Sequence, residues 1–201
     1  MDTALFARGL ILGLSIAAVV GPIALLCLRR SLASGFALGF VSGMGAATAD
    51  ATYAAVASFG VSALAAVLVE QRVWLRLVGG IFLLYLGLRT LRTPPATSSA
   101  ETTNPGLRLA GAYSSTLALT LSNPMTIMSF AAIFASIGAG SLDLVIGVFL
   151  GSAAWWLILA GAASRLRTAF TQERMQLVNY ASGALIVAFG VQSLAAALLQ
   201  T

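Results

Sequence analysis

The sequence predicts an all-α polytopic membrane protein with six transmembrane helices, and three observations support this class. The chain has 201 residues, of which 59% are hydrophobic and only 8% are charged, whereas soluble domains carry about 25% charged residues. Six apolar stretches approach the roughly 20 residues that a spanning helix needs. A single polar segment divides them into three and three. The predicted spans are 4–28, 38–65, 73–91, 109–135, 144–163 and 177–199.

We expect the first span to be retained as a helix rather than removed as a signal peptide. Its apolar run continues to Leu28, which is too long for the core of a signal peptide, roughly 7–15 residues. Arg29 and Arg30 then end the span. Glu70 and Arg72 separate the second span from the third.

The polar segment 92–108 is a linker between the two groups of three spans. It contains two adjacent prolines and a run of threonine and serine, and it has too little apolar surface to pack. We therefore predict a single membrane domain over 1–201. Within it, 1–91 form a first three-helix repeat, 92–108 a cytoplasmic linker and 109–201 a second three-helix repeat.

The distribution of arginine predicts the orientation of the helices, because cytoplasmic loops are rich in basic residues. Eight arginines gather on the side that holds the linker, which we expect to be cytoplasmic, and three on the other side. Both termini are then periplasmic. Three spans in each half oblige the halves to face opposite ways, which predicts two inverted repeats, an architecture typical of secondary transporters. The three outer arginines are Arg8, Arg72 and Arg76.

Two prolines interrupt the apolar stretches, at Gly21-Pro22 in the first span and at Asn123-Pro124 in the fourth. Proline has no N–H to donate, which frees the carbonyls of Ala18 and Thr120. Matching helix breaks in two halves are typical of a transporter's substrate site. The opposing interpretation is that nearby hydroxyls only satisfy the broken turn. The candidate site residues from these segments are Gly21, Pro22, Thr120, Ser122, Asn123 and Pro124.

The repeat is inferred from the helix count, the central linker and the matched breaks. An offset of 102 residues places Pro22 on Pro124. Beyond the prolines, the residues that this offset aligns show little identity.

Asp50 lies near the middle of the second span, roughly 18 Å of helix from either surface. A carboxylate at the bilayer centre costs at least about 2.5 kcal/mol, which a bound proton, a water-filled cavity or a cationic substrate would offset. We expect Asp50 to exchange a proton or to bind substrate, with Thr48 and Tyr53 solvating it or touching the substrate. The structural alternative is a protonated carboxyl group that hydrogen-bonds between helices.

Residues that the chain lacks exclude several function classes. It has no histidine, which excludes histidine ligation of haem or metal and histidine-based acid–base catalysis. The single cysteine, Cys27, excludes an internal disulfide and a dithiol relay. No loop of the form G-x-x-x-x-G-K-[ST] indicates nucleotide binding. We therefore predict that the protein is not an enzyme and needs no metal or cofactor. The net charge of +5 indicates arginine-rich cytoplasmic loops rather than nucleic-acid binding.

Several other features are interpreted as structural. Arg76 lies near a span end, from which its head group can snorkel to the interface. Trp155-Trp156 either pack in the core or line a pathway, and Asn179 and Gln192 are expected to hydrogen-bond between helices. Small faces for close helix contact, which would serve internal packing or a homodimer, are expected at Gly39, Gly43, Gly45, Gly79, Gly80 and Gly87.

The chain also carries a series of recognisable motifs. The most specific are Leu84-Tyr85-Leu86-Gly87 and Thr120-Leu121-Ser122-Asn123-Pro124. The others are Gly13-Leu14-Ser15, Gly21-Pro22, Gly43, Ala49-Asp50, Tyr53, Leu77-Val78-Gly79-Gly80 and Arg92. With the chain length, the six spans and the central linker, this pattern resembles the lysine exporter (LysE/RhtB) family of amino-acid efflux proteins over nearly the whole chain.

The resemblance implies a bacterial inner-membrane exporter of amino acids or close derivatives, driven by the proton motive force. It places Pro22, Asp50, Asn123 and Pro124 at matching motif positions. Two departures disfavour a basic amino-acid substrate. Ile23-Ala24 stand where the lysine-exporting branch tends to carry polar residues, and Met125 stands where many members have a lysine. Two alternatives stay open: a heavy-metal or other cation permease of the same superfamily, and a non-transporting assembly subunit.

Overall fold

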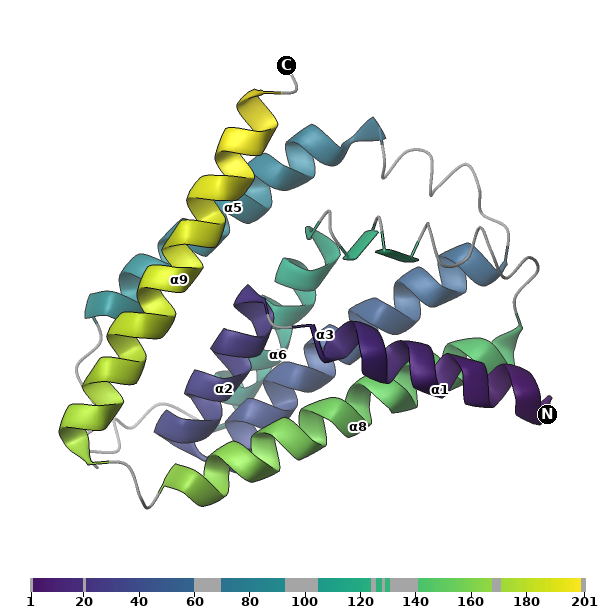
Figure 1. Ribbon diagram of the computed structural model, residues 1–201, viewed down its shortest axis with the longest axis horizontal. Helices are drawn as coiled ribbons and strands as arrows, with labels where there is room; N and C mark the ends of the chain where they lie inside the picture. The colour runs from purple at the N-terminus through teal and green to yellow at the C-terminus, as the bar shows by residue number, and fades with distance from the viewer. Residues whose placement is uncertain are drawn as a thin grey trace.

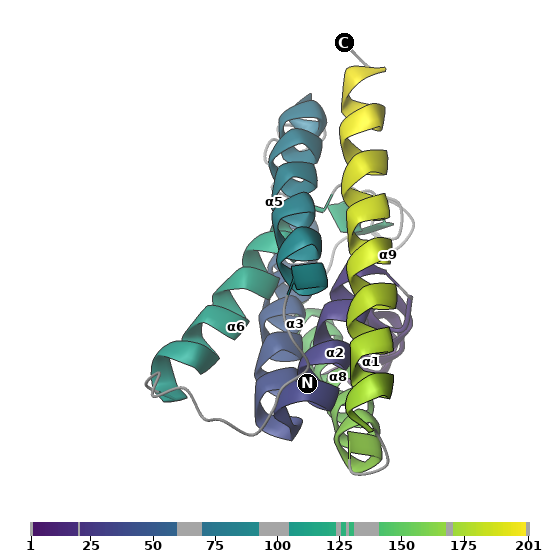
Figure 2. The same cartoon turned by 90° about the vertical axis from the view of Figure 1, so that its left-hand side faces the viewer.

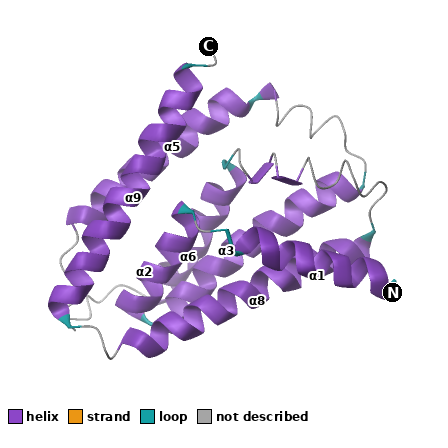
Figure 3. Ribbon diagram, in the orientation of Figure 1, coloured by secondary structure: helices purple, strands orange, loops and turns teal. Residues whose placement is uncertain are grey.

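The computed structural model describes residues 2–19, 21–59, 70–92, 105–123, 126–127, 129–130, 141–167 and 171–199. The regular elements in these ranges are helices and include no strand (Figure 3), which confirms the predicted all-α class. They are α1 (Thr3–Ala17), α2 (Pro22–Ser34), α3 (Phe36–Ser58), α5 (Arg72–Arg92), α6 (Pro105–Leu121), α8 (Leu142–Leu166) and α9 (Gln172–Leu198).

The predicted first span is broken beside Pro22, as the sequence indicates. α1 ends at Ala17, α2 begins at Pro22, and the two helices are bent by 80° relative to each other. Proline suits the first position of a helix because the N–H that it lacks has no intrahelical partner there. At the other end of α1, the Asp2 carboxylate accepts from the backbone N–H groups of Ala4 (3.0 Å) and Leu5 (3.1 Å).

One predicted boundary is wrong, because Arg29 and Arg30 do not end the first span. α2 continues to Ser34, and both arginines hydrogen-bond to neighbouring helices. Arg29 Nε donates to Asn179 Oδ1 on α9 at 2.8 Å, which also confirms the interhelical role predicted for Asn179. The acceptors of the Arg30 guanidinium are Ser42 Oγ on α3 (2.8 Å), and Ala112 O (3.0 Å) and Ser115 Oγ (2.9 Å) on α6.

Helix α3 is central in the molecule, with α6 packed along one side and α8 along another (Figure 1). It runs parallel to α6 and antiparallel to α8. The contacts that fix these directions are Gly45 with Tyr113 and Tyr53 with Leu121 for α6, and Gly43 with Trp156 and Asp50 with Ser152 for α8.

Helices α1 and α8 run parallel and approach closely because glycines line their contact. A methyl group at Gly9 would come within 2.3 Å of Leu144 O, and one at Gly13 within 2.1 Å of Val148 O. Small residues four positions apart allow such approach between apolar helices. The sequence analysis singled out other glycines as small faces and missed the Gly-x-x-x-Gly spacing on each of these two helices. The glycines that face α1 from α8 are Gly147 and Gly151.

Helices α5 and α9 form an antiparallel pair at one side of the molecule (Figure 1), and they stand next to each other in the perpendicular view (Figure 2). Gly80 lies against Gly190, and Gly87 against Gly183. The six small faces predicted from the sequence all meet other parts of the same chain, so these glycines do not indicate a dimer surface. Their neighbours are Ser31 for Gly39, Trp156 for Gly43, Tyr113 for Gly45, Ser122 for Gly79, Leu194 for Gly80 and Val187 for Gly87.

Three of the described helices, α5, α8 and α9, are long and apolar enough to cross a membrane, and the bent α1–α2 pair makes a fourth candidate. These correspond to four of the predicted spans. The other two coincide in part with α3 and α6. Helix α6 has 17 residues, fewer than a full span needs, and the continuations predicted over 60–65 and 131–135 lie outside the described residues. The count of six therefore stays a prediction.

The predicted linker 92–108 extends too far at its C-terminal end. Helix α6 begins at Pro105, because proline at a helix start needs no N–H partner, so 105–108 are helical. The remainder of the linker, 93–104, lies outside the described residues.

Candidate functional site

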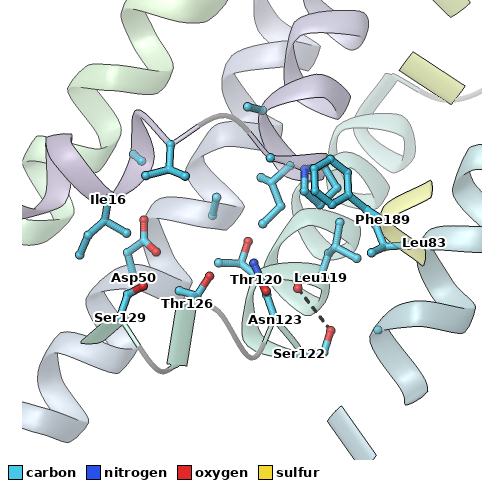
Figure 4. A pocket seen from close by; sticks show the side chains of 18 of the residues that line it. Ile16, Asp50, Leu83, Leu119, Thr120, Ser122, Asn123, Thr126, Ser129 and Phe189 are labelled. Atoms are coloured by element: carbon cyan, nitrogen blue, oxygen red, sulfur yellow. Dashed lines mark hydrogen bonds between the residues drawn. The ribbon is translucent and has the colours of Figure 1, made fainter. Parts of the chain in front are cut away.

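A half-open cavity of about 620 Å³ lies between the α5–α9 pair and the helices α1, α2, α3, α6 and α8. Its wall includes both sides of the break between α1 and α2, and the end of α6 (Figure 4). Most of the lining is apolar. The hydroxyl, amide and charged side chains on the wall are Ser15, Asp50, Arg76, Thr120, Ser122, Asn123, Thr126, Ser129, Gln192 and Ser193.

Asp50 reaches this cavity from the middle of α3, with only 3% of its surface exposed. Its Oδ2 accepts a hydrogen bond from the hydroxyl of Ser152 on α8 at 2.7 Å. Ser152 Oγ in turn accepts from Trp156 Nε1 at 3.1 Å. In Figure 4, Asp50 lies on the same side of the cavity as Ser129 and Thr126. The hydrogen bonds run from Trp156 to Ser152 and from Ser152 to Asp50 Oδ2. Oδ1 is therefore the carboxyl oxygen available to a proton or a ligand.

The start of α2 opens onto the same cavity as Asp50. Gly21 is the N-cap of α2 and supplies no side-chain cap, and Pro22 follows at the first helical position. Both residues line the cavity, and a methyl group at Gly21 would meet nothing within 4 Å. A helix N-terminus carries a partial positive charge and unsatisfied N–H groups. The structure thus places the predicted Gly21-Pro22 break at the cavity.

The end of α6 contributes Thr120, Ser122 and Asn123 to the cavity wall. The carbonyl of Thr120, expected to be freed by Pro124, accepts from Asn123 N at 3.1 Å. The hydroxyls of Thr120 and Ser122 bond carbonyls of the preceding turn of α6, and none of these bonds reaches the Thr120 carbonyl that the opposing interpretation expected a hydroxyl to satisfy. Pro124 itself lies outside the described residues. These hydroxyl bonds run from Thr120 Oγ1 to Thr116 O (2.8 Å) and from Ser122 Oγ to Ala118 O (2.7 Å).

Thr48 and Tyr53 flank Asp50 in the sequence but are not among the cavity-lining residues. Thr48 Oγ1 donates to Met44 O at 2.8 Å and accepts from Tyr113 at 2.9 Å. Tyr53 donates to Leu121 O at 2.5 Å. That carbonyl lies in the last turn of α6, where helical carbonyls lack intrahelical partners. Both side chains therefore join α3 to α6 rather than solvate Asp50.

Sequence reasoning missed several residues of the site, among them Thr126, Ser129 and Ser193 on the cavity wall. Ser152 was not identified, although the offset that aligns Pro22 with Pro124 also aligns it with Asp50. Trp156 was left between core packing and a pathway. It is 3% exposed, which confirms core packing, and it also lines the cavity.

Arg76 was expected to snorkel to the interface. Instead it is half-buried, lines the cavity and donates from Nη1 to Ala196 O at 3.3 Å. No sequence signal separates an arginine that snorkels from one that turns inward, because both lie near a helix end. In the described part of the chain, no group of three or more His, Cys, Asp or Glu side chains is placed to hold a metal ion.

Comparison with known proteins identifies the family of this chain. The family model for the LysE type translocator matches residues 14–196. The chain is 29% identical over 198 residues to the "Putative amino acid efflux protein YcgF" of Bacillus subtilis (strain 168), which covers 92% of this chain and 93% of that relative. It is 29% identical over 174 residues to the "Uncharacterized membrane protein YahN" of Escherichia coli (strain K12), covering 82% of this chain and 77% of the relative. No solved structure matches significantly. Because the family match runs from the end of α1 almost to the end of α9, the chain belongs to the LysE type translocator family.

Proposed function

We propose that this protein is a secondary transporter that exports amino acids or closely related derivatives across the bacterial inner membrane in exchange for protons. One observation carries the proposal: a buried carboxyl group, Asp50, lines a cavity of about 620 Å³ at the broken ends of two helices. Intramembrane acids are costly and mark substrate or proton pathways. The family, and the name of the Bacillus relative, support solute efflux as the class of activity.

In this proposal a zwitterionic solute binds inside the cavity with its ammonium group at Asp50. Its carboxylate requires hydrogen-bond donors or positive charge at some distance from Asp50. The cavity offers the N-terminus of α2 at Gly21-Pro22, together with the side-chain amide of Asn123. Helix ends that face a midplane cavity serve this purpose in other secondary transporters.

The hydrogen-bond pattern around Asp50 supports a role in proton exchange. Ser152 accepts from Trp156, so its single hydroxyl proton is directed at Asp50 Oδ2. A proton that arrives from solvent would then occupy Oδ1, the same oxygen that an ammonium group would approach. Proton and substrate would therefore exclude each other at Asp50, which is the requirement for coupling export to proton entry.

The directions of the helices support the predicted arrangement of two inverted three-helix repeats. Helices α1 and α8 are parallel, as are α3 and α6, while α3 with α8 and α5 with α9 are antiparallel. A chain that crosses the membrane six times, alternating in direction, gives all four of these relations. In this arrangement the two halves would rock against each other around the cavity, with both termini in the periplasm.

The proposal is tested by efflux from a bacterial strain that lacks its own amino-acid exporters. Cells that express the chain are loaded with a panel of dipeptides, and free amino acids are followed in the medium with and without a proton uncoupler. We expect one class of amino acid to leave the cells, and both the uncoupler and Asp50→Asn to stop this efflux. Glu173→Gln, which removes an exposed acid at the start of α9, should leave it unchanged.

Two outcomes would contradict the proposal. Efflux at the normal rate by well-inserted Asp50→Asn would remove Asp50 from the mechanism. Absence of efflux for every amino acid, from a protein that inserts normally, would argue against amino-acid export. Growth on toxic metal salts would then be measured, since increased tolerance would favour the cation permease, and unchanged tolerance the assembly subunit.

A further inference from the structure

The cavity carries two formal charges of opposite sign on opposing walls. Asp50 projects from α3, and Arg76 belongs to the α5–α9 pair on the other side. Of the described residues that line the cavity, these two are the only charged ones. A cavity with one anionic and one cationic group matches a ligand that has both an ammonium group and a carboxylate.

The guanidinium of Arg76 has hydrogen-bonding capacity left for a ligand. Among the described residues, Arg76 Nη1 donates to Ala196 O at a rather long 3.3 Å, whereas a guanidinium has five N–H donors. The backbone of Arg76 is held in place separately, because Ser193 Oγ donates to its carbonyl at 3.0 Å. Arg76 therefore sits on a fixed backbone at the cavity wall, with most of its donors free of the acceptors that the structure describes.

The surface around the two charges is mostly apolar, and its other polar side chains are uncharged hydroxyls and amides. Aliphatic and aromatic side chains from all seven described helices contribute to it, and no second acid is present on the described wall. A basic side chain on the solute would find no counter-charge there, whereas an aliphatic or aromatic one would gain free energy from burial. The large apolar residues of this surface include Leu12, Ile16, Leu83, Leu119, Trp156 and Phe189.

We propose that Arg76 binds the carboxylate of the exported solute, which makes the cavity selective for zwitterionic amino acids with apolar side chains. The inference rests on the proposed export function. Arginine holds a carboxylate through two parallel charge-assisted hydrogen bonds. The N-terminus of α2 offers only about half a charge, and Asn123 offers none. Arg76 is therefore a specificity-determining residue that positions the solute across the cavity from Asp50.

The experiment compares ligands that keep or lose the carboxylate. Purified protein in detergent is titrated calorimetrically with leucine, with leucinamide, which lacks the carboxylate, and with lysine. The wild type should bind leucine at least tenfold more tightly than leucinamide or lysine. Arg76→Gln should weaken leucine binding at least tenfold and leave leucinamide unchanged, because only the carboxylate loses its partner. Asp50→Asn should weaken both ligands.

Two further variants secure the interpretation. Arg8→Gln removes an exposed arginine on the same predicted side of the membrane and should bind leucine normally. Arg76→Lys keeps the positive charge but lacks the planar guanidinium that bonds a carboxylate through two donors. Its loss of leucine affinity should therefore be intermediate. It also provides a second measurement if Arg76→Gln is unstable.

The outcomes separate the inference from the function on which it rests. Normal leucine binding by folded Arg76→Gln, or equal wild-type binding of leucine and leucinamide, would overturn the carboxylate site while leaving export intact. Tighter binding of lysine than leucine would overturn the apolar selectivity. A wild type that binds no amino acid and shows no efflux would overturn both the inference and the proposed function.

Discussion

The carboxyl group of Asp50 is held by a neighbour from the other half of the chain. Ser152 donates to it across the α3–α8 contact, and the two positions are 102 residues apart. The same offset aligns Pro22 with Pro124. Asp50 was predicted because one acid in an apolar run is conspicuous. Ser152 was not, since a serine in a membrane helix usually bonds its own backbone, and only the antiparallel packing of α3 and α8 brings it to Asp50.

We predict that Ser152→Ala slows export by about ten- to hundredfold without preventing insertion. Hydrogen bonds to charged groups contribute about 1.5–3 kcal/mol, and each 1.4 kcal/mol corresponds to about a factor of ten. The measurement is the initial rate of amino-acid efflux, normalised to the amount of protein in the membrane.

Two matched variants show whether Ser152 acts by positioning Asp50. Trp156→Phe removes the Nε1 donor that orients Ser152 and should give a smaller loss. Ser164 lies on the same helix, and among the described residues its hydroxyl bonds Gly161 O within α8. The efflux rate of Ser164→Ala should therefore be normal. Wild-type efflux from Ser152→Ala would show that Asp50 needs no partner on α8.

At the scale of single helices, the contact between α1 and α8 depends on glycines that the sequence does not distinguish from other glycines. We predict that Gly13→Ala destabilises the protein, because its new methyl group would lie 2.1 Å from Val148 O. Overpacking costs about 1–3 kcal/mol, or about 2–12 °C in melting temperature for a chain of this size. Thermal unfolding in detergent measures the shift. Gly161→Ala has open space at its methyl position and should melt as the wild type does.

The anchoring of α2 provides a second prediction at this scale. Arg30 bonds α3 and α6 through three acceptors, so Arg30→Met would leave Ser42 and Ser115 without that donor inside the bundle. A hydrogen bond to a charged group contributes about 1.5–3 kcal/mol, and we expect a lower melting temperature than the wild type. Arg92→Met removes an exposed arginine and should melt normally. Equal melting of both variants would mean that Arg30 carries no stabilising contact.

For the whole molecule, apolar run lengths and proline positions predicted the helical class, the broken first span and the apolar stretches that become α5, α8 and α9. They did not predict where α2 ends, since two arginines look the same whether they leave the bilayer or bind neighbouring helices. Nor did they predict the cavity wall formed by α5 and α9. Arg76 and Phe189 belong to that wall, and they come together with Asp50 only through contacts between segments far apart in the chain.

The alternation of helix directions yields a prediction about the termini. Six crossings place both ends of the chain on the same side of the membrane, which the arginine distribution predicts to be the periplasm, whereas five or seven crossings would separate them. The only cysteine, Cys27, is fully buried, so Cys27→Ala provides a background for Ala4→Cys and Leu199→Cys, both at exposed positions. In intact spheroplasts, a membrane-impermeant maleimide should label both.

A position on the cytoplasmic side of the membrane provides the control for this labelling. Arg92→Cys at the exposed end of α5 should react only after permeabilisation, because α5 must end in the cytoplasm if α1 begins outside. Labelling of Ala4→Cys with protection of Leu199→Cys would require an odd number of crossings. An odd number is incompatible with two equivalent halves of opposite orientation, and the inverted repeat would then be abandoned even if export were established.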